Sequence, residues 1–457
     1  MAKPSLPKGC RDFTSTTLAQ RNHVIELIKT AFRLFGYLPI ETPALETKET
    51  LMGKYGEEGD RLIFKVLNSG NFLDKVTLPE SNSDEAAKSF VGQIYDKALR
   101  YDLTVPFARF VVQHYNELTF PFKRYQIQPV WRADRPQLGR YREFLQCDAD
   151  VIGSESLLNE VELLKLVGRV FSQLNLSVVI KVNNRKILAG IGETVGLLAD
   201  QLIDFTVALD KLDKIGLQGV IAEMTAKGIS QTSIAKLTPL IEFKGSNELK
   251  LHFLKEFLID SSVGLLGVTE LNQILVLTKD LPLELDLTLA RGLNYYTGAI
   301  IEVKAAEGTF TGSICGGGRY DNLTGIFGLN GLSGVGISFG IDRILDVLTG
   351  TGKLDALQTD NGLPLVLIVH FGSEEQIFGL SLLDQLRHEN ISSELYPDLT
   401  KKIGKQLDYA NKKGIPFVVV IGSEEMATNC FVLKDMKAGT QMKLPLNELI
   451  QVLKTQI

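Results

Sequence analysis

Arginines and carboxylates are concentrated in one short stretch of the chain, residues 122–153, which reads FKRYQIQPVWRADRPQLGRYREFLQCDADVIG. Guanidinium groups are planar, permanently charged and well shaped to pair with phosphate oxygens, whereas carboxylates can hold an ammonium group or orient the guanidinium groups. Both sets of side chains together suit a ligand that is a zwitterion beside a polyphosphate. The arginines are Arg124, Arg132, Arg135, Arg140 and Arg142, and the carboxylates are Glu143, Asp148 and Asp150.

Two predicted strands position these side chains. Residues 125–131 and 144–152 both have the apolar, β-rich pattern of strands. Because the connection between them must turn back on itself, the stretch is expected to form a hairpin, with the arginines crowded around its turn.

Four other stretches carry recognisable patterns. They read RYDLT at 100–104, LARGLNYYTG at 289–298, SICGGGRYDNL at 313–323 and GVGISFGIDRI at 334–344. With the hairpin, they resemble the class II aminoacyl-tRNA synthetases, in the form found in the histidyl-tRNA synthetase family. The hairpin resembles motif 2 of that class, residues 334–344 resemble motif 3, and the other three resemble the substrate-binding segment and the two histidine-specific segments. The resemblance covers nearly the whole chain.

Length and composition are those of an ordinary soluble, multidomain protein. A chain of 457 residues is expected to form about two to four domains. No apolar run approaches the roughly twenty residues of a membrane helix, and the N-terminus lacks a secretory signal, so we expect a cytoplasmic protein without membrane association. The four cysteines are scattered, which supports neither a disulfide framework nor a zinc site. The net charge of −5 argues against indiscriminate binding of nucleic acids but leaves specific RNA recognition open.

The N-terminal third contains a predicted helix followed by a strand. Residues 18–35 have apolar residues at helical spacing, and residues 37–43 indicate a short strand that ends at a proline. This pair resembles motif 1, whose role in the family is dimerisation, although an ordinary helix–strand unit has the same pattern. Residues 68–96 are polar and irregular, which favours a surface loop or hairpin.

The rest of the chain separates into a helical part and an alternating part. Residues 187–261 favour helix, residues 349–364 have linker composition, and the segment beyond them alternates β-α-β-α-β before two more strands. The expected fold is therefore α+β: an antiparallel-sheet catalytic domain of class II type, a helical insertion, and a C-terminal α/β domain that resembles the family's anticodon-binding domain. The expected boundaries are 1–186 and 276–350 for the catalytic domain, 187–275 for the insertion, 351–363 for the linker and 364–457 for the C-terminal domain.

Two glycine pairs resemble nucleotide-binding loops only superficially. Gly350 and Gly352 lack the spacing and hydroxyl of a phosphate-binding loop, and Gly190 and Gly192 lack the full dinucleotide fingerprint. Both pairs are expected to lie in turns, so ATP must be bound in another way.

The resemblance assigns roles to particular residues. It implies that Arg132 contacts the α-phosphate of ATP and the carboxylate of the amino acid, that Arg343 binds the distal phosphates, that Arg291 reaches the α-phosphate, and that Arg140 adds to the ATP site. Asp102, Thr104, Gln146 and Asp150 would surround the ammonium group of histidine, and Tyr295 and Tyr296 would line its side-chain pocket, beside Arg132 and Arg291. Arginines and Mg²⁺ suit the charge that develops during attack on a phosphate. One departure is Asn294, where the family commonly has aspartate.

The activity implied by the resemblance is the ATP-dependent joining of histidine to tRNA. L-histidine and ATP would form histidyl-adenylate, and a homodimer would transfer histidine to the terminal ribose of tRNA(His). A rival interpretation is a catalytically silent regulatory paralogue that partners ATP phosphoribosyltransferase, a class that generally lacks the anticodon domain and the catalytic residues. A non-catalytic RNA-binding protein is a third interpretation, but it leaves the phosphate-directed arginines without a use. The role of the insertion stays open between clamping the tRNA acceptor stem and stabilising the fold.

Overall fold

The structure is a computed structural model. It describes residues 3–74, 76–79, 81, 83–290, 295–357, 362–400 and 402–456, apart from the side chains of residues 57 and 58. The chain divides into two compact units. The first comprises Met1–Thr14 and Gln20–Gln358, and the second comprises Ser15–Ala19 and Thr359–Ile457.

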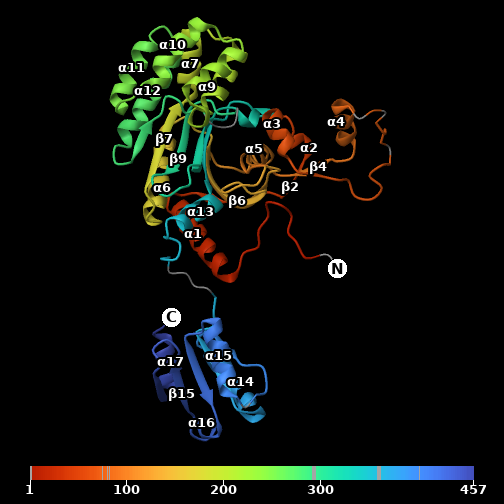
Figure 1. Ribbon diagram of the computed structural model, residues 1–457, viewed down its shortest axis with the longest axis vertical. Coiled ribbons are helices and arrows are strands. Elements are labelled where there is room, and N and C mark those ends of the chain that lie inside the picture. The colour runs from red at the N-terminus through yellow and green to blue at the C-terminus, as the bar shows by residue number, and fades with distance from the viewer. Residues whose placement is uncertain are drawn as a thin grey trace. The chain divides into compact units, whose positions relative to one another are not determined.

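An eight-stranded sheet forms the centre of the first unit (Figure 1). Its strands, in spatial order, are β1 (Leu38–Pro39), β5 (Phe122–Trp131), β6 (Glu143–Ile152), β11 (Gly334–Gly340), β10 (Ser313–Tyr320), β9 (Ala299–Ala305), β7 (Val178–Asn184) and β8 (Leu283–Leu285). Only the two outermost pairs are parallel, β1 with β5 and β7 with β8, and the other neighbours are antiparallel. The predicted α+β fold with an antiparallel-sheet domain is confirmed.

The predicted hairpin is formed by β5 and β6, which pair from Phe122 opposite Ile152 to Trp131 opposite Glu143. Successive side chains of a strand point to opposite faces of the sheet, so each strand has two sets of side chains. One face is apolar and carries Tyr125, Cys147, Ala149 and Val151, all part of the main hydrophobic core. The other face carries a polar row that continues across the sheet: Arg124, Gln126 and Gln128 of β5 lie opposite Asp150, Asp148 and Gln146 of β6.

Three helices cover the apolar face of this sheet: α1 (Ser15–Leu34), α6 (Leu158–Gln173) and α13 (Ile341–Gly350). The ring of Phe32 in α1 stacks on Tyr125 with 5.3 Å between centroids, and Phe171 of α6 contacts Phe339 of β11. The predicted N-terminal helix is thus confirmed. β1 spans only Leu38–Pro39, so the strand is shorter than the sequence indicates.

The polar face is covered in part by α5 (Thr104–Gln113), whose Phe107 packs against Phe122. Near it lie α2 (Lys48–Leu51), α3 (Gly56–Leu62), η1 (Leu323–Phe327) and a small sheet of β2 (Leu45–Thr47), β4 (Lys97–Leu99) and β3 (Lys65–Val66). The buried carboxylates Asp102, Asp148 and Asp150 lie on the side of the sheet that this layer covers.

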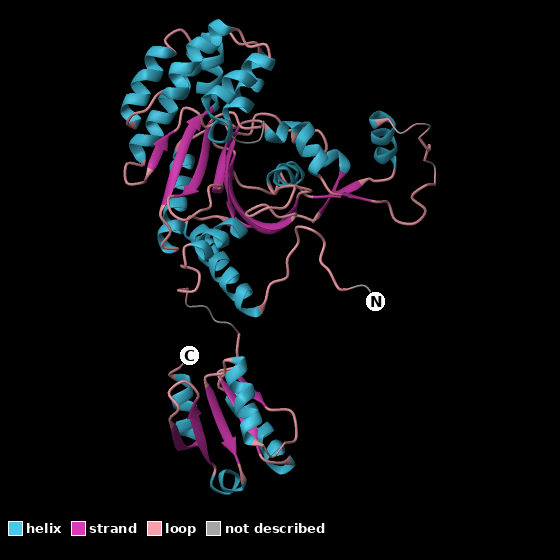
Figure 2. Ribbon diagram, viewed as in Figure 1, coloured by secondary structure: helices cyan, strands magenta, loops and turns pink. Residues whose placement is uncertain are grey.

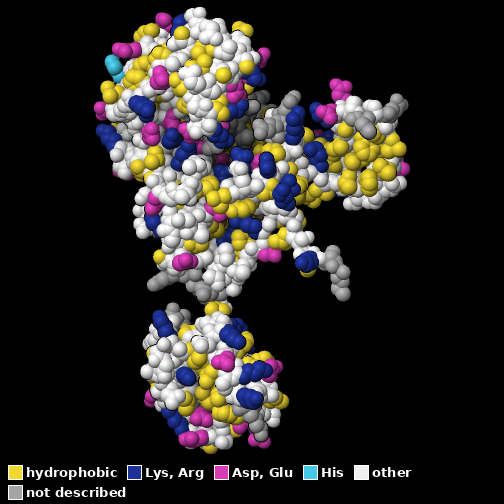
Figure 3. All heavy atoms as spheres, viewed as in Figure 1, with side chains coloured by type: hydrophobic (Ala, Val, Ile, Leu, Met, Phe, Trp, Pro, Cys, Tyr) yellow, Lys and Arg dark blue, Asp and Glu magenta, His cyan; other side chains and the backbone are white. Residues whose placement is uncertain are grey.

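The segment between β3 and β4 differs from the prediction of a loop or hairpin, because it contains a ten-residue helix, α4 (Asp84–Gln93). The Ser83 side chain caps the helix by accepting a hydrogen bond from the backbone N–H of Ala86. None of the described residues of α4 is buried, which explains why no apolar stripe marks it in the sequence. Apolar side chains gather on this part of the surface in Figure 3, and Leu67, Leu73 and Leu78 are exposed there.

The predicted helical region forms six helices, which Figure 2 shows as a group at one end of the sheet. They are α7 (Arg185–Val195), α8 (Ala199–Leu209), α9 (Leu212–Ala226), α10 (Gln231–Glu242), α11 (Asn247–Phe257) and α12 (Ser262–Leu277). Their buried residues belong to the same hydrophobic core as the sheet. Gly190 and Gly192 lie inside α7 rather than in a turn. A Cβ atom on Gly190 would come within 2.5 Å of the Gly264 backbone in α12, so the close contact between these two helices requires glycine there. Gly352 lies in a turn as expected, but Gly350 is the last residue of α13, so the turn begins one residue later than predicted for this pair.

The predicted linker begins with residues that belong to the first unit. The Leu354 side chain is buried, and the Lys353 ammonium group donates to the carbonyl of Asn175 at 2.7 Å and pairs with Glu307. Linker composition therefore does not keep these residues from packing.

The second unit has a five-stranded sheet in the order β13 (Ser393–Leu395), β12 (Val366–His370), β14 (Phe417–Ile421), β15 (Cys430–Asp435) and β16 (Gln441–Pro445). Helices α14 (Ser373–His388) and α15 (Ile403–Lys413) connect the three parallel strands, as the alternating pattern predicts. The two last strands are antiparallel additions, and α16 (Ser423–Thr428) and α17 (Leu446–Lys454) were not predicted. Across the described residues of both units, no helix is long and apolar enough to cross a bilayer.

Candidate active site

A cavity of about 160 Å³ lies beside the turn of the β5–β6 hairpin. Three of the arginines predicted to bind ATP, Arg132, Arg140 and Arg343, line it together with Gln146. The rest of the lining comes from the hairpin and from β10, β11 and the start of α13: Asp134, Gly139, Tyr141, Phe144, Ser313, Ile314, Cys315, Gly316, Ser338, Gly340 and Asp342. The fold thus brings motif 2-like and motif 3-like segments, about two hundred residues apart in sequence, to one cavity.

Backbone carbonyl groups orient two of these arginines. Arg343, in the first turn of α13, donates from Nε to the carbonyl of Gly139 at 2.8 Å and from Nη1 to that of Ser313 at 2.9 Å. Arg132 donates from Nε to the carbonyl of Tyr101 at 3.0 Å, and its guanidinium group lies 4.3 Å from the centre of the Tyr101 ring. Fixed guanidinium groups at a cavity wall suit phosphate oxygens, because little ordering is then needed on binding.

The other arginines of the hairpin are placed differently. Arg140 lies 3.7 Å from Asp134 in a partly exposed pair, Arg135 is exposed, and Arg142 donates from Nε to the carbonyl of Asp134. Arg124 was expected at the turn, but it is fully buried near the opposite end of the hairpin, where it forms a 2.6 Å ion pair with Asp150. The turn is therefore cationic without Arg124.

Carboxylates form a second, buried group on the polar face of the sheet. Asp150 accepts a hydrogen bond from the Tyr320 hydroxyl at 2.7 Å, and Asp102 accepts one from the Tyr55 hydroxyl at 2.7 Å. Burial raises the pKa of Asp102 and of Asp150, and it raises the pKa of Asp148 to about 7 although the nearby Arg124 guanidinium opposes that shift. Glu143 points to the opposite face of the sheet from this group, is itself exposed at the start of β6 and accepts from Trp131 Nε1, so it takes no part in the group.

Several buried acceptors in this region have no hydrogen-bond partner among the residues that the structure describes. They are Asp102 Oδ2, Asp148 Oδ1 and Gln146 Oε1. Buried polar atoms are nearly always hydrogen bonded in native proteins, so such acceptors indicate a ligand that supplies N–H donors. An ammonium group has three donors and an imidazole ring has one or two.

Two tyrosines stand beside these carboxylates. The rings of Tyr295 and Tyr296 contact each other edge-on with 4.9 Å between centroids, and Tyr295 also contacts Tyr320. Burial raises the pKa of both hydroxyls, with Asp102 adding to the shift in each case and Asp150 to that of Tyr296. A hydrogen bond with Thr104 opposes the shift in the pKa of Tyr295. The structure thus gathers Asp102, Thr104, Asp150, Tyr295 and Tyr296, with both tyrosines neutral at physiological pH.

Glycines leave the room that this arrangement needs. A Cβ atom at Gly336 would lie 1.8 Å from Asp150 Oδ1, and one at Gly318 would lie 2.9 Å from the Tyr296 ring. Any other residue at either position would displace the side chain it faces.

Sequence reasoning left several neighbours of the site without a role. Tyr320 and Ser338 share the polar face with assigned residues, so strand alternation could have identified them, and Asp148, expected only in general terms as an ammonium-binding or arginine-orienting carboxylate, lies on the same face. Tyr55 lies directly before α3 and had no pattern that pointed to Asp102. Arg291 and Asn294 lie outside the described residues. Within the described parts of the chain, no group of three or more His, Cys, Asp or Glu residues could hold a metal ion.

The sheet, with an arginine-lined cavity at the hairpin turn and buried carboxylates beside it, defines a catalytic domain of the class II aminoacyl-tRNA synthetases. A family model described as histidyl-tRNA synthetase matches residues 92–344, and one described as anticodon binding domain matches residues 365–456. The chain belongs to the histidyl-tRNA synthetase family.

Relatives along the full length agree with this assignment. A protein named histidine–tRNA ligase from Christiangramia forsetii is 55% identical, with 99% of both chains covered, and one from Phocaeicola vulgatus is also 55% identical with the same coverage. Among solved structures, the histidyl-tRNA synthetase from Nostoc sp. PCC 7120 is 30% identical with a TM-score of 0.79, and all of both chains is covered.

Proposed function

We propose that this protein is a histidine–tRNA ligase. L-histidine attacks the α-phosphorus of ATP through its carboxylate, which forms histidyl-adenylate and releases diphosphate. Histidine is then transferred to the terminal ribose at the 3′ end of tRNA(His), which releases AMP. The observation that carries the proposal is the position of the arginine-lined cavity beside buried carboxylates, two of which, Asp102 and Asp148, each have one oxygen without a hydrogen-bond donor among the described residues. The arginine-lined cavity binds the phosphates of ATP, and the buried carboxylates bind the amino acid.

Residue roles follow from this division. We assign Arg132, Arg140 and Arg343 to ATP, with Arg132 and Arg291 acting at the α-phosphate beside the carboxylate of histidine. Asp102, Thr104, Gln146 and Asp150 hold the ammonium group, and Tyr295 and Tyr296 contact the imidazole. Preorganised cationic donors stabilise the charge that builds up on the phosphorus oxygens during attack.

Mg²⁺ fits the same end of the site. Magnesium at nucleotide phosphates usually uses one or two carboxylates and keeps several waters. Asp134 lines the cavity and would hold the ion together with the phosphates of ATP, whereas both oxygens of the neighbouring Asp342 are engaged by Arg11 and by the backbone N–H of Leu145. The ion would add positive charge where the phosphate charge is greatest.

The other parts of the chain receive roles from the family. We propose that residues 1–186 and 276–350 form the catalytic domain, 187–275 the insertion, 351–363 the linker and 364–457 the anticodon-binding domain. We also propose a cytoplasmic homodimer that uses α1 and β1 at its interface. The regulatory-paralogue alternative is not favoured, because the anticodon-binding model matches residues 365–456 and the relatives named histidine–tRNA ligase match over the full length.

The test is histidine-dependent exchange of labelled pyrophosphate into ATP by the purified protein. We expect exchange with histidine and background exchange with the other common amino acids. Absence of exchange with histidine under conditions where the protein is folded would refute the proposal.

A further inference from the structure

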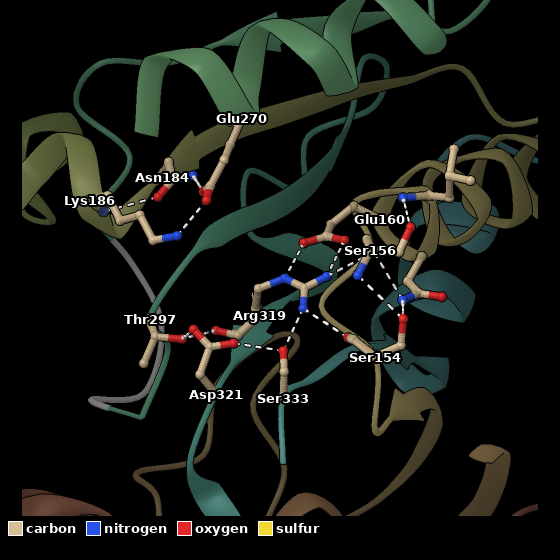
Figure 4. Close-up of polar contacts among 12 residues, drawn as sticks. Ser154, Ser156, Glu160, Asn184, Lys186, Glu270, Thr297, Arg319, Asp321 and Ser333 are labelled. Atoms are coloured by element: carbon tan, nitrogen blue, oxygen red, sulfur yellow. Dashed lines mark hydrogen bonds and ion pairs between the residues drawn. The ribbon is translucent and has the colours of Figure 1, made fainter. Parts of the chain in front are cut away.

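Arg319, in β10, lies at the centre of a closed set of polar contacts (Figure 4). Its Nε and Nη2 atoms each donate to a carboxylate oxygen of Glu160 at 2.6 Å. The remaining N–H groups donate to the carbonyls of Ser154 and Ser156 and to the hydroxyl of Ser333, so all five are used. Both members of the ion pair are buried. An arginine whose donors are all used within the protein holds elements together and does not bind a phosphate.

Strand alternation places the neighbours of Arg319 against the tyrosine pair. Gly318 faces the ring of Tyr296, and Tyr320 contacts the ring of Tyr295 with 6.2 Å between centroids. Arg319 and Asp321 point the other way. There, a Cβ atom at Gly298 would lie 3.0 Å from the Cδ atom of Arg319, so the chain just after the tyrosine pair runs against the Arg319 side chain.

Hydrogen bonds continue from Arg319 to that segment. The Ser333 hydroxyl accepts from Arg319 Nη1, so its own proton is donated to Asp321 Oδ1 at 2.7 Å. The other oxygen of Asp321 accepts from the hydroxyl of Thr297 at 2.6 Å. An ionised carboxylate only accepts, which fixes the direction of both bonds.

Backbone contacts close the same region. The N–H of Thr297 donates to the carbonyl of Arg319 at 2.8 Å, and the carbonyl of Gly298 accepts from the N–H of Arg185 at 2.8 Å. Thr297 directly follows Tyr296. A chain of contacts therefore runs from Glu160 in α6 to the residue beside the tyrosine pair.

We propose that Arg319 and Asp321 are positioning residues for amino-acid selection. They fix the backbone at Thr297 and Gly298, and through it the positions of Tyr295 and Tyr296 against the imidazole of histidine. The inference rests on the proposed function and adds to its histidine site two residues that act through the tyrosines.

Asp321→Ala and Thr297→Val test this inference. Thr297→Val removes the hydrogen bond from the Thr297 hydroxyl to Asp321, and Asp321→Ala removes that bond together with the one from Ser333. Each variant should raise the KM for histidine about three- to tenfold in pyrophosphate exchange. The KM for ATP and the kcat should stay within about twofold, because contacts to the imidazole are the same in the ground state and the transition state. The double variant should show much less than the product of the two effects, because both changes remove the same contact.

Conservative variants should restore the wild-type behaviour. Thr297→Ser keeps the hydroxyl, and Asp321→Asn keeps one acceptor and offers an N–H to the Thr297 oxygen. Lys186→Gln is the matched control: it removes a partly buried ion pair with Glu270 in the same region that makes no contact with Thr297 or Asp321. Arg319 itself is a poor test position, because its removal would leave Glu160 buried without its counterion.

Three results would overturn the inference: an unchanged KM for histidine, equal increases for histidine and ATP, or a lower melting temperature with unchanged kinetics. A wild-type protein without histidine-dependent exchange would refute the proposed function, and this inference would fall with it. Normal wild-type exchange with unaffected variants would refute the inference alone.

Discussion

Arg11 forms an ion pair with Asp342, a residue 331 positions further along the chain. The Arg11 guanidinium group also lies 3.4 Å from the centre of the Tyr141 ring, and the second oxygen of Asp342 accepts from the backbone N–H of Leu145. Tyr141 and Asp342 both line the arginine-rich cavity, and Asp342 directly precedes Arg343. The N-terminal segment thus connects the hairpin to α13 at the end of the site assigned to ATP.

Removal of this connection should weaken ATP use selectively. For Arg11→Gln we expect the KM for ATP to rise about three- to tenfold, as for the loss of one charge-assisted contact, with the KM for histidine within about twofold. Pyrophosphate exchange with each substrate varied in turn measures both. Lys405→Gln, which breaks an exposed pair with Asp398 in the second unit, is the control and should change neither. Equal effects on both substrates would contradict the role given to Arg11.

The pKa of Asp148 predicts how stability depends on pH. Because burial raises this pKa to about 7, the folded protein keeps a proton that the unfolded chain loses near pH 4. The contribution of Asp148 to the free energy of unfolding therefore falls as the pH rises from about 4 to about 7. Above about pH 7 the folded protein bears the full cost of burying the ionised carboxylate. Asp148→Asn removes the penalty. We expect its melting temperature to be close to that of the wild type at about pH 4 and to exceed it by about 2–5 °C at pH 8.

Differential scanning calorimetry of the full chain at several pH values measures this difference. Asp96→Asn, at an exposed carboxylate, should show a difference that does not vary with pH. A constant or opposite difference for Asp148→Asn would mean that Asp148 is ionised in the folded protein throughout.

Arg291 is proposed to act on charge that grows at the α-phosphate. Arg291→Ala should lower the rate of adenylate formation more than about a hundredfold, in line with the loss of a preorganised donor, while histidine binding is comparatively retained. Single-turnover kinetics and equilibrium binding of histidine separate the two effects. Near-normal exchange would remove Arg291 from the mechanism.

The Tyr296 hydroxyl is proposed to discriminate histidine from other amino acids. Tyr296→Phe keeps the ring, and should therefore weaken histidine use much more than ATP use, because a buried polar partner of the imidazole is lost. The KM values from pyrophosphate exchange test this expectation. An equal effect on both substrates would place the selective contact elsewhere.

Removal of the second unit should separate activation from tRNA charging. Since Leu354 is buried in the first unit, the truncation is best placed after Leu357 rather than at the start of the linker composition. We expect the shortened protein to form adenylate and to charge tRNA(His) poorly. Unchanged aminoacylation kinetics would contradict the assignment of residues 364–457 to anticodon binding.

Local patterns predicted the parts of the fold that bury a regular set of side chains. The β5–β6 hairpin and α1 are marked by alternation and by helical spacing, because each buries one face against the core. The α4 helix escaped prediction because it buries none of its described residues. Gly190 was expected in a turn because glycine often marks turns, whereas here it lets α7 pack closely against Gly264 of α12, a contact that no local pattern records.

The site was predicted unevenly for the same reason. Arg132, Arg140, Gln146 and Arg343 line one cavity, and they could be predicted because each belongs to a segment with a recognisable sequence motif. Arg124 was placed at the turn because charge and proximity in sequence suggested it, whereas its strand register puts it opposite Asp150. Tyr55 reaches Asp102 from a separate segment, so only the tertiary structure reveals that contact.

The continuity of the hydrophobic core between the sheet and helices α7–α12 determines how the insertion behaves mechanically. Ile187, Leu271 and Ile274 share that core with Val182 and Val303 of the sheet, so the inner helices α7 and α12 should melt together with the sheet as one cooperative unit. Deletion of residues 187–275 would therefore expose apolar residues of the sheet to solvent. The insertion is not an independently folded domain that can be removed without this effect. Any motion of the insertion during catalysis is therefore expected in helices α8–α11, while α7 and α12 stay packed against the sheet.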